Sequence, residues 1–150
     1  MAKILVLNGS PHKSASTTMA VTNAFVKGMC EGGEYESEII NISDLNVTPC
    51  MGCLSCWART EGECVIKNDD MPAVKKRIEE ADIIIESYPL YFFGMPGQME
   101  LLTASALSLL TNALSQQTLF QPSHTLTNIC QVLNLHPVQL MSLTVDIELL

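Results

Sequence analysis

Short apolar runs alternate with helix-like stretches over the first hundred residues, and this order constrains the fold more than any other feature. The run from Lys3 to Asn8 is apolar and ends in Gly9-Ser10-Pro11, which suits a strand buried on both faces. The expected strands are residues 3–8, 35–42 and 82–87, and the expected helices are residues 16–31 and 70–81. Such alternation predicts an α/β fold in which helices cover both faces of a parallel sheet.

The composition excludes several classes of partner. The chain has 150 residues, with 8 Lys plus Arg against 16 Asp plus Glu, which suits a single domain over residues 1–150. A nucleic-acid-binding face needs Lys and Arg to displace counterions, so we expect no nucleic acid partner. No apolar run approaches the roughly 18 residues of a membrane span, and the N-terminus lacks a signal-peptide pattern. We therefore expect a cytoplasmic protein with no membrane partner and no disulfides.

The loop after the first strand has the chemistry of an anion site. Residues 9–18 offer hydroxyl groups, two potentially cationic side chains (His12 and Lys13) and the N-terminus of the following helix, capped by Ser16 or Thr17. Backbone N–H groups at a helix N-terminus favour phosphate. The loop matches neither the P-loop pattern nor the dinucleotide fingerprint. An ordinary polar turn with a capping serine is the alternative interpretation.

A second loop, residues 88–97, follows the third predicted strand and is rich in aromatic residues, Gly and Pro. Such a loop can present a rigid apolar surface and backbone N–H groups to a planar heterocycle. Aromatic side chains beside a strand belong more often to a hydrophobic core, which is the alternative here.

Residues 1–102 resemble the flavodoxin-like NAD(P)H-dependent FMN reductases, through Leu7-Asn8-Gly9-Ser10-Pro11 and the segment from Pro89 to Gln98. The resemblance implies a flavodoxin-like fold, FMN as cofactor and a homodimer. It implies that the FMN phosphate lies against Ser10, His12, Ser16, Thr17 and Thr18. It implies that the flavin ring lies against Pro89, Leu90, Tyr91, Phe92 and Gly94. His12 stands where the family usually has Arg, and Ser16 where it often has Asn.

Four cysteines lie within fifteen residues. Cys50, Cys53, Cys56 and Cys64 form the pattern C-x2-C-x2-C-x7-C, which is typical of [4Fe–4S] ligation and less natural for zinc. The region also resembles the compact cysteine motif of iron–sulfur flavoproteins, a branch of the same fold. Many related flavin reductases carry similar cysteines without an implied cluster, so non-ligating thiols remain an alternative.

The last third of the chain differs from the rest. Residues 101–150 hold only Asp146 and Glu148 among the charged residues, and Leu supplies 14 of these fifty positions. The family resemblance covers residues 1–103 and stops at about residue 104, so we expect an incomplete or irregular fold beyond that point. We hypothesise that residues 104–150 are not native family sequence, for instance through a frameshift. A divergent C-terminal segment that completes the sheet in its own way is the alternative.

The resemblance implies an FMN-dependent oxidoreductase that passes electrons from NAD(P)H through the flavin to a small-molecule acceptor. Because the flavin carries the redox chemistry, no side chain is nominated as a catalytic acid or base. Two alternatives remain open: an electron-transfer protein with FMN and a [4Fe–4S] cluster, or an inactive fragment that lacks C-terminal elements.

Overall fold

A computed structural model describes residues 1–60, 62–91, 94–112 and 139–145. The strands are β1 (Ala2–Asn8), β2 (Tyr35–Asn41), β3 (Ile83–Pro89) and β4 (Gln139–Val145). The α-helices are α1 (Thr17–Gly32), α2 (Ser55–Ala58), α3 (Met71–Glu80) and α4 (Gly97–Asn112). Two short 3₁₀ helices, η1 (Lys13–Ala15) and η2 (Ile42–Asp44), follow the ends of β1 and β2.

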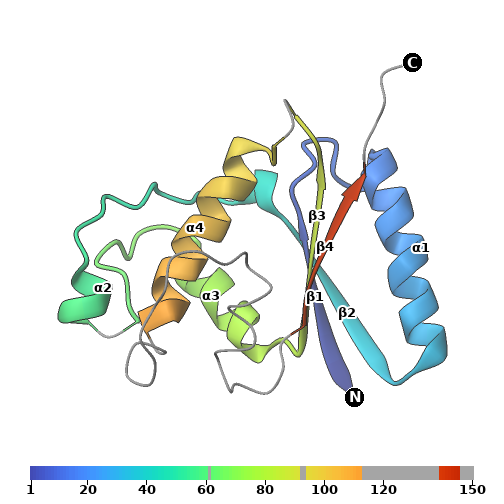
Figure 1. Cartoon of the computed structure of the whole chain (residues 1–150), viewed down its shortest axis with the longest axis horizontal. Helices are drawn as coiled ribbons and strands as arrows, with labels where there is room; N and C mark the ends of the chain where they lie inside the picture. The colour runs from blue at the N-terminus through green and yellow to red at the C-terminus, as the bar shows by residue number, and fades with distance from the viewer. Residues whose placement is uncertain (61, 92–93, 113–138, 146–150) are drawn as a thin grey trace.

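The four strands form one parallel sheet in the order β2-β1-β3-β4. This is the flavodoxin-like strand order, and the predicted α/β fold with a parallel sheet is confirmed. The order reverses direction between β1 and β3, because the chain steps outward from β1 to β2 and then crosses back to β3 (Figure 1).

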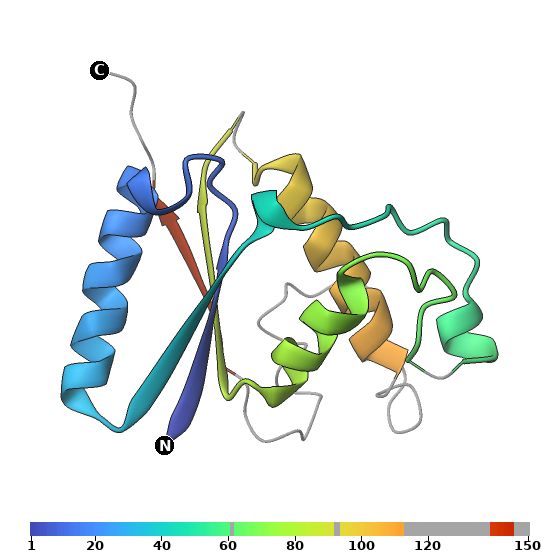
Figure 2. The same ribbon diagram turned by 180° about the vertical axis from the view of Figure 1, so that it is seen from behind.

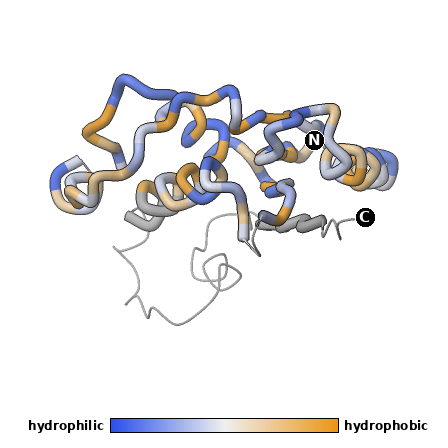
Figure 3. Tube along the Cα trace, turned by 90° about the horizontal axis from the view of Figure 1, so that it is seen from above, coloured by the Kyte–Doolittle hydropathy of each residue, from blue (hydrophilic) through white to orange (hydrophobic). Residues whose placement is uncertain are grey.

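Helices cover both faces of the sheet, as the alternation of strands and helices predicts. Helix α1 lies on one face, and α3 and α4 lie on the other (Figures 1 and 2). Seen from above, hydrophobic and hydrophilic stretches alternate along these helices (Figure 3), as expected for helices with one face on a sheet.

Alternating side chains of the strands feed two separate cores. Ile4 and Val6 of β1 pack with Val26 on the α1 side. Leu5 and Leu7 pack on the opposite side, with residues of α3 and α4 that include Val74, Ile78, Met99 and Leu102. Because successive strand residues point to opposite faces, a strand buried on both sides needs a continuous apolar run. The apolar run from Ile4 to Leu7 meets this requirement.

The ends of β1, β2, β3, α1 and α3 agree with the predicted ranges within two residues. Residues 43–68, for which no helix or strand is predicted, contain the rest of η2 and the one-turn helix α2. Gly33 follows the end of α1, and Ser16 caps its start by accepting a hydrogen bond from the Met19 N–H at 3.1 Å. Helix α3 has Pro72 in its first turn, where the missing N–H of proline costs no helical hydrogen bond.

Beyond residue 104 the structure describes the end of α4 and one strand. Helix α4 continues without a break through Asn112, and β4 (Gln139–Val145) pairs with the whole length of β3 from Ile83 to Pro89. Residues 113–138 and 146–150 lie outside the described part of the chain. None of the helices described is long and apolar enough to cross a membrane.

Candidate flavin site and thiol cavity

The two predicted binding loops meet at one edge of the sheet. β1 and β3 are parallel neighbours, with Asn8 opposite Ser87, so the segments that follow them emerge side by side (top of Figure 1). In open α/β sheets, ligands bind outside the carboxyl ends of the strands where the strand order reverses. The reversal in this chain lies between β1 and β3, so both loops stand at the position where a ligand is expected.

Three polar residues, which we call the polar row, lie side by side beneath the first loop. Asn41 of β2, Asn8 of β1 and Ser87 of β3 are register partners across the sheet. The Asn8 amide donates from Nδ2 to Asn41 Oδ1 at 2.9 Å and accepts the Ser10 backbone N–H on Oδ1 at 3.0 Å. The Ser87 carbonyl accepts the Gly9 N–H at 2.8 Å. The polar row therefore takes up the first two N–H groups of the loop.

The rest of the loop satisfies most of its own N–H groups. Pro11 has none, and the N–H groups of Lys13 and Ser16 bond to carbonyls within the loop. The N–H groups of Thr17 and Thr18 have no partner in the described part of the chain, as the start of an α-helix requires. Two donors at the positive end of α1 are thus available to an anion.

The predicted phosphate-site residues have different exposures within this loop. Ser10 and Thr18 are buried, Ser16 is half-buried, and His12 and Thr17 are exposed. Lys13, in a left-handed conformation with φ of 50°, forms an ion pair with Asp44 of η2. The five predicted residues therefore lie in the β1–α1 loop and in the first two positions of α1.

In the second loop, Tyr91 and Gly94 pair with each other shortly after the end of β3. Tyr91 and Gly94 exchange two backbone hydrogen bonds of 2.9 and 3.0 Å. Pro89 is buried, Leu90 packs against the α3–α4 core, and Tyr91 has 47% of its surface exposed. Phe92, also predicted to contact the flavin ring, lies outside the described residues. The loop therefore contributes both to the hydrophobic core, through Pro89 and Leu90, and to the exposed surface, through Tyr91.

Gly9 lets the first loop pass close to the second. A Cβ atom at residue 9 would lie 3.0 Å from Tyr88 Cβ and 3.3 Å from Met99 Cβ. This spacing leaves no room for a larger side chain without a shift in the backbone of β3 or of α4.

The four clustered cysteines share one cavity. Cys50, Cys53, Cys56 and Cys64 all line it, and Met51 and Trp57 stand in the same wall. The backbone is left-handed at Gly52 (φ 67°) and Leu54 (φ 54°), so the chain reverses between successive cysteines. These reversals explain how a short irregular segment presents several thiols to the same space. Helix α2, which contributes Cys56 and Trp57 to the lining, lies on the far side of α3 and α4 from the sheet (Figure 1).

The thiols differ in their protonation chemistry. Hydrogen bonding to Ser55 lowers the pKa of exposed Cys53 below the usual thiol value. Burial raises the pKa of Cys56, and the nearby Cys64, Cys50 and Cys53 raise it further through charge repulsion. The lower pKa of Cys53 makes its thiol easier to deprotonate than that of Cys56.

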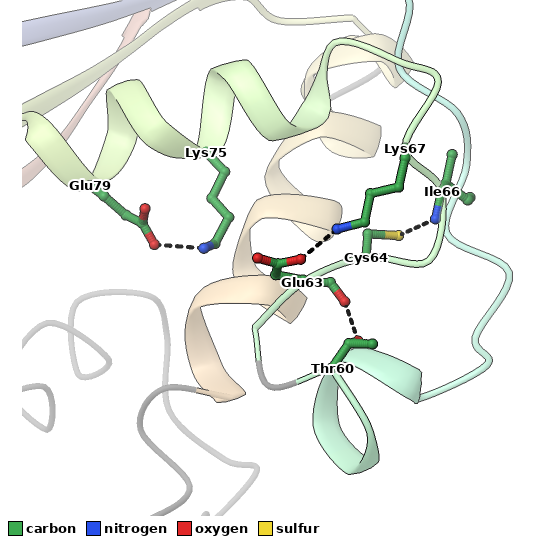
Figure 4. A network of polar contacts seen from close by, with 7 residues as sticks. All are labelled: Thr60, Glu63, Cys64, Ile66, Lys67, Lys75 and Glu79. Carbon is green, nitrogen blue, oxygen red and sulfur yellow. Dashed lines mark hydrogen bonds and ion pairs between the residues drawn. The ribbon is translucent and has the colours of Figure 1, made fainter.

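A polar network holds the Cys64 end of the cavity (Figure 4). The Cys64 Sγ accepts the Ile66 backbone N–H at 3.4 Å, and the Thr60 hydroxyl donates to the Glu63 carbonyl. Lys67 donates to the Glu63 carboxylate at 2.6 Å, and this hydrogen bond lowers the pKa of Glu63. N–H donors to sulfur are one of the ways in which proteins tune iron–sulfur sites.

Among the residues that the structure describes, no three His, Cys, Asp or Glu side chains are grouped so that they could hold a metal ion. Four thiols that line one cavity are the kind of ligand that a [4Fe–4S] cluster needs. Their sulfur atoms are not gathered closely enough here to form a metal site. Metal binding by the four cysteines stays a prediction.

Residues 2–106 match the family described as NADPH-dependent FMN reductase. The chain belongs to this family. The match ends close to residue 103, where the sequence resemblance to the family stops, and it includes both loops at the reversal point and all four clustered cysteines.

Curated relatives of this FMN reductase family member are iron–sulfur flavoproteins. The iron–sulfur flavoprotein MJ1083 of Methanocaldococcus jannaschii is 37% identical over 100 residues, which are 67% of this chain and 49% of that protein. An iron–sulfur flavoprotein of Methanosarcina thermophila is 32% identical over 100 residues, 67% of this chain and 50% of that protein. The chain spans about half the length of the curated relatives it matches.

Solved structures share the fold of this FMN reductase family member at low sequence identity. An NAD(P)H:quinone oxidoreductase from Methanothermobacter marburgensis has a TM-score of 0.60 at 15% identity, over 95% of this chain and 84% of that one. An FMN-dependent NADH-azoreductase from Bacillus anthracis, solved with FMN, has a TM-score of 0.52 at 20% identity, over 70% of this chain and 55% of that one. These similarities support the flavodoxin-like fold.

The sequence analysis missed the polar row. Asn8 and Ser87 each stand at the end of a predicted strand, and Asn41 lies one residue before the end of another. Parallel strands bring their carboxyl ends to one edge, so this common position was the signal available in the sequence.

Proposed function

We propose that this chain is an FMN-dependent oxidoreductase that takes electrons from NAD(P)H and passes them to a small-molecule acceptor. The observation that carries the proposal is that the Thr17 and Thr18 N–H groups have no partner among the described residues and lie in the segment that follows β1, where the strand order reverses. Bound FMN would supply the redox chemistry, since the flavin accepts hydride and passes electrons on.

The first loop supports the proposal as a phosphate site. Two N–H donors at the start of α1 combine with hydroxyl groups of the loop and with the helix dipole to favour a dianion. Hydrogen-bond donors matter here, because the chain carries a formal net charge of −8 and Lys13 is already paired with Asp44. The phosphate of FMN would be held by Ser10, His12, Ser16, Thr17 and Thr18.

The second loop supports the proposal as a platform for a flat ring. Buried Pro89 and half-buried Leu90 fix its base, and the paired backbone of Tyr91 and Gly94 fixes its turn. A rigid apolar surface loses little entropy when a planar ring packs on it. The platform would also exclude water from one side of the flavin.

The first test is whether the chain binds FMN. Protein purified under reducing conditions is titrated with FMN, and absorbance and flavin fluorescence are recorded; NADH and NADPH oxidation are then measured with quinone, nitro, azo and free-flavin acceptors. We expect saturable FMN binding and acceptor-dependent oxidation. No perturbation of the flavin signal at any protein concentration would overturn the proposal.

A backbone variant tests the phosphate site directly. Thr17→Pro removes one of the two available N–H groups, while Pro suits the first position of a helix and Ser16 already has the extended backbone (φ −81°, ψ 148°) that a following Pro requires. We expect FMN affinity to fall roughly tenfold or more, since hydrogen bonds to charged groups are the strong ones. Thr17→Ala keeps the N–H and is the matched control; equal affinities in the two variants would contradict the assignment.

A second candidate function is electron transfer through a [4Fe–4S] cluster held by Cys50, Cys53, Cys56 and Cys64. The observation that favours it is the single cavity lined by all four thiols. Anaerobic reconstitution with iron and sulfide, followed by metal analysis, tests it. We expect bound iron in the wild type and loss of iron in Cys53→Ser, whereas Cys30→Ser, a change on α1, should leave the iron content unchanged. Wild-type protein that takes up no iron would rule the cluster out.

A further inference from the structure

The hydrogen bonds of the polar row fix the orientation of both of its amide groups. A backbone N–H can only donate, so the Ser10 N–H requires Asn8 Oδ1, the oxygen of the amide, as its partner. That places Asn8 Nδ2, a donor, against Asn41, which must therefore present its oxygen. The amide of Asn8 is fully buried, with 0% of the residue exposed.

Two contacts from the end of β2 reach the same loop. Asn41 orients the Asn8 amide from the last residue of β2, and Asp44 of η2 binds the Lys13 ammonium. The first contact is buried at Asn8 and the second is exposed, so the amide pair is the stronger constraint on loop position.

We propose that Asn8 and Asn41 are positioning residues for the phosphate of FMN: Asn8 holds the Ser10 N–H, Asn41 holds Asn8, and the pair thereby keeps Ser10 and the start of α1 in binding geometry. This inference rests on the proposed phosphate site in the β1–α1 loop. Asn8, which is fully buried, acts on the ligand only through the Ser10 N–H.

A fully buried amide, such as that of Asn8, lowers stability unless its polar atoms are hydrogen-bonded. A buried amide without partners would destabilise the sheet, and an apolar residue at position 8 would extend the strand equally well. Asn8 instead uses its acceptor on the loop and one of its donors on the neighbouring strand. The position of the loop, more than the stability of β1, is what this side chain secures.

The test compares FMN with riboflavin, which carries the same ring and lacks the phosphate. Dissociation constants for both are measured by fluorescence titration with the wild type and the Asn8→Ala and Asn41→Ala variants. We expect FMN affinity to fall roughly three- to tenfold in each variant, as for the loss of one buried hydrogen bond, with riboflavin affinity nearly unchanged.

Thr103→Ala is the matched control. It removes another side-chain hydrogen bond of the core, from Thr103 Oγ1 to Glu86 Oε1 at 3.2 Å, without touching the first loop or the polar row. It should lower the melting temperature but leave the FMN-to-riboflavin affinity ratio unchanged.

Each outcome decides the proposal. Folded Asn8→Ala with a wild-type affinity ratio overturns it, and if Asn8→Ala fails to fold, the half-buried Asn41→Ala decides alone in the same way. Wild-type protein that binds riboflavin as tightly as FMN would overturn the phosphate site itself, and this inference with it. A change in the FMN-to-riboflavin affinity ratio equal to that of Thr103→Ala would reduce the polar row to a purely structural role.

Discussion

At the scale of single residues, Glu86 is a carboxyl group buried in the described core, where burial disfavours its charged form. It stands in β3 between Ile84 and Tyr88, on the face covered by α3 and α4, and only 4% of its surface is exposed. Burial raises the pKa of Glu86, and the Thr103 hydroxyl, which donates to its Oε1 at 3.2 Å, partly opposes that shift. Neutral glutamic acid is therefore favoured in the folded chain relative to the unfolded one.

The raised pKa of Glu86 predicts how stability changes with pH. Below the ordinary glutamate pKa, Glu86 is protonated in both the folded and the unfolded chain, and its contribution to the free energy of unfolding is greatest. As the pH rises from that value through the higher folded-state pKa, the unfolded chain loses its proton first, and this contribution is lost. Glu86→Gln should therefore become more stable relative to wild type as the pH rises. Urea unfolding between pH 4 and 8 measures this, with exposed Glu100→Gln as control. A constant difference across the range would contradict the prediction.

Gly9 gives a second prediction at this scale. Gly9→Ala places a Cβ at 3.0 Å from Tyr88 Cβ, and we expect a loss of about 1–3 kcal/mol in unfolding free energy, because neither backbone can retreat freely. Gly28→Ala, in α1 with no atom within 4 Å of the added Cβ, should instead stabilise by about 0.5–1 kcal/mol. Chemical denaturation of both variants checks the pair; a destabilised Gly28→Ala or a neutral Gly9→Ala would refute the steric argument.

At the scale of elements, the parts that follow local rules could be predicted from the sequence. Ser16 as a cap, Pro72 in a first turn and the apolar runs of β1 and β3 depend on neighbours within a few residues. The contact of Asn8 with Asn41 joins positions 33 residues apart, and it requires the register of two parallel strands. The Lys13–Asp44 pair likewise depends on where η2 lies against the loop, which no local pattern specifies.

The α1 cap can be tested apart from the flavin. Ser16 Oγ accepts the Met19 N–H, so Ser16→Ala should cost about 1 kcal/mol and lower the melting temperature by roughly 2–4 °C. Ser14→Ala, an exposed serine of the same loop, is the matched control and should change the melting temperature little. Thermal unfolding followed by circular dichroism gives both values. Equal shifts in the two variants would show that the cap contributes nothing measurable.

At the scale of the whole molecule, the sequence and the structure divide the chain differently. Charge and family resemblance both change near residue 104, and the family match ends at residue 106. The described backbone instead continues α4 to Asn112 and adds β4 to the free edge of β3. A strand can join a parallel ladder through its backbone alone, so the absence of family side chains does not prevent pairing. Whether residues 104–150 are native family sequence stays a hypothesis, which reading the coding DNA in its other frames tests.

The proposed flavin site joins the segments that follow β1 and β3, which are far apart in the chain, so ligand binding reports whether these segments fold together. FMN at about one hundred times its dissociation constant should stabilise the folded chain by ~2.7 kcal/mol. For a chain of this length, that corresponds to a rise in melting temperature of about 5–10 °C. Riboflavin at the same concentration should give a smaller rise, because it lacks the phosphate that the Thr17 and Thr18 N–H groups would bind. Differential scanning fluorimetry with an extrinsic dye that does not overlap flavin emission measures both. A single cooperative transition that FMN leaves unmoved would show that the chain folds without forming the site, and the absence of a cooperative transition would favour the inactive-fragment alternative.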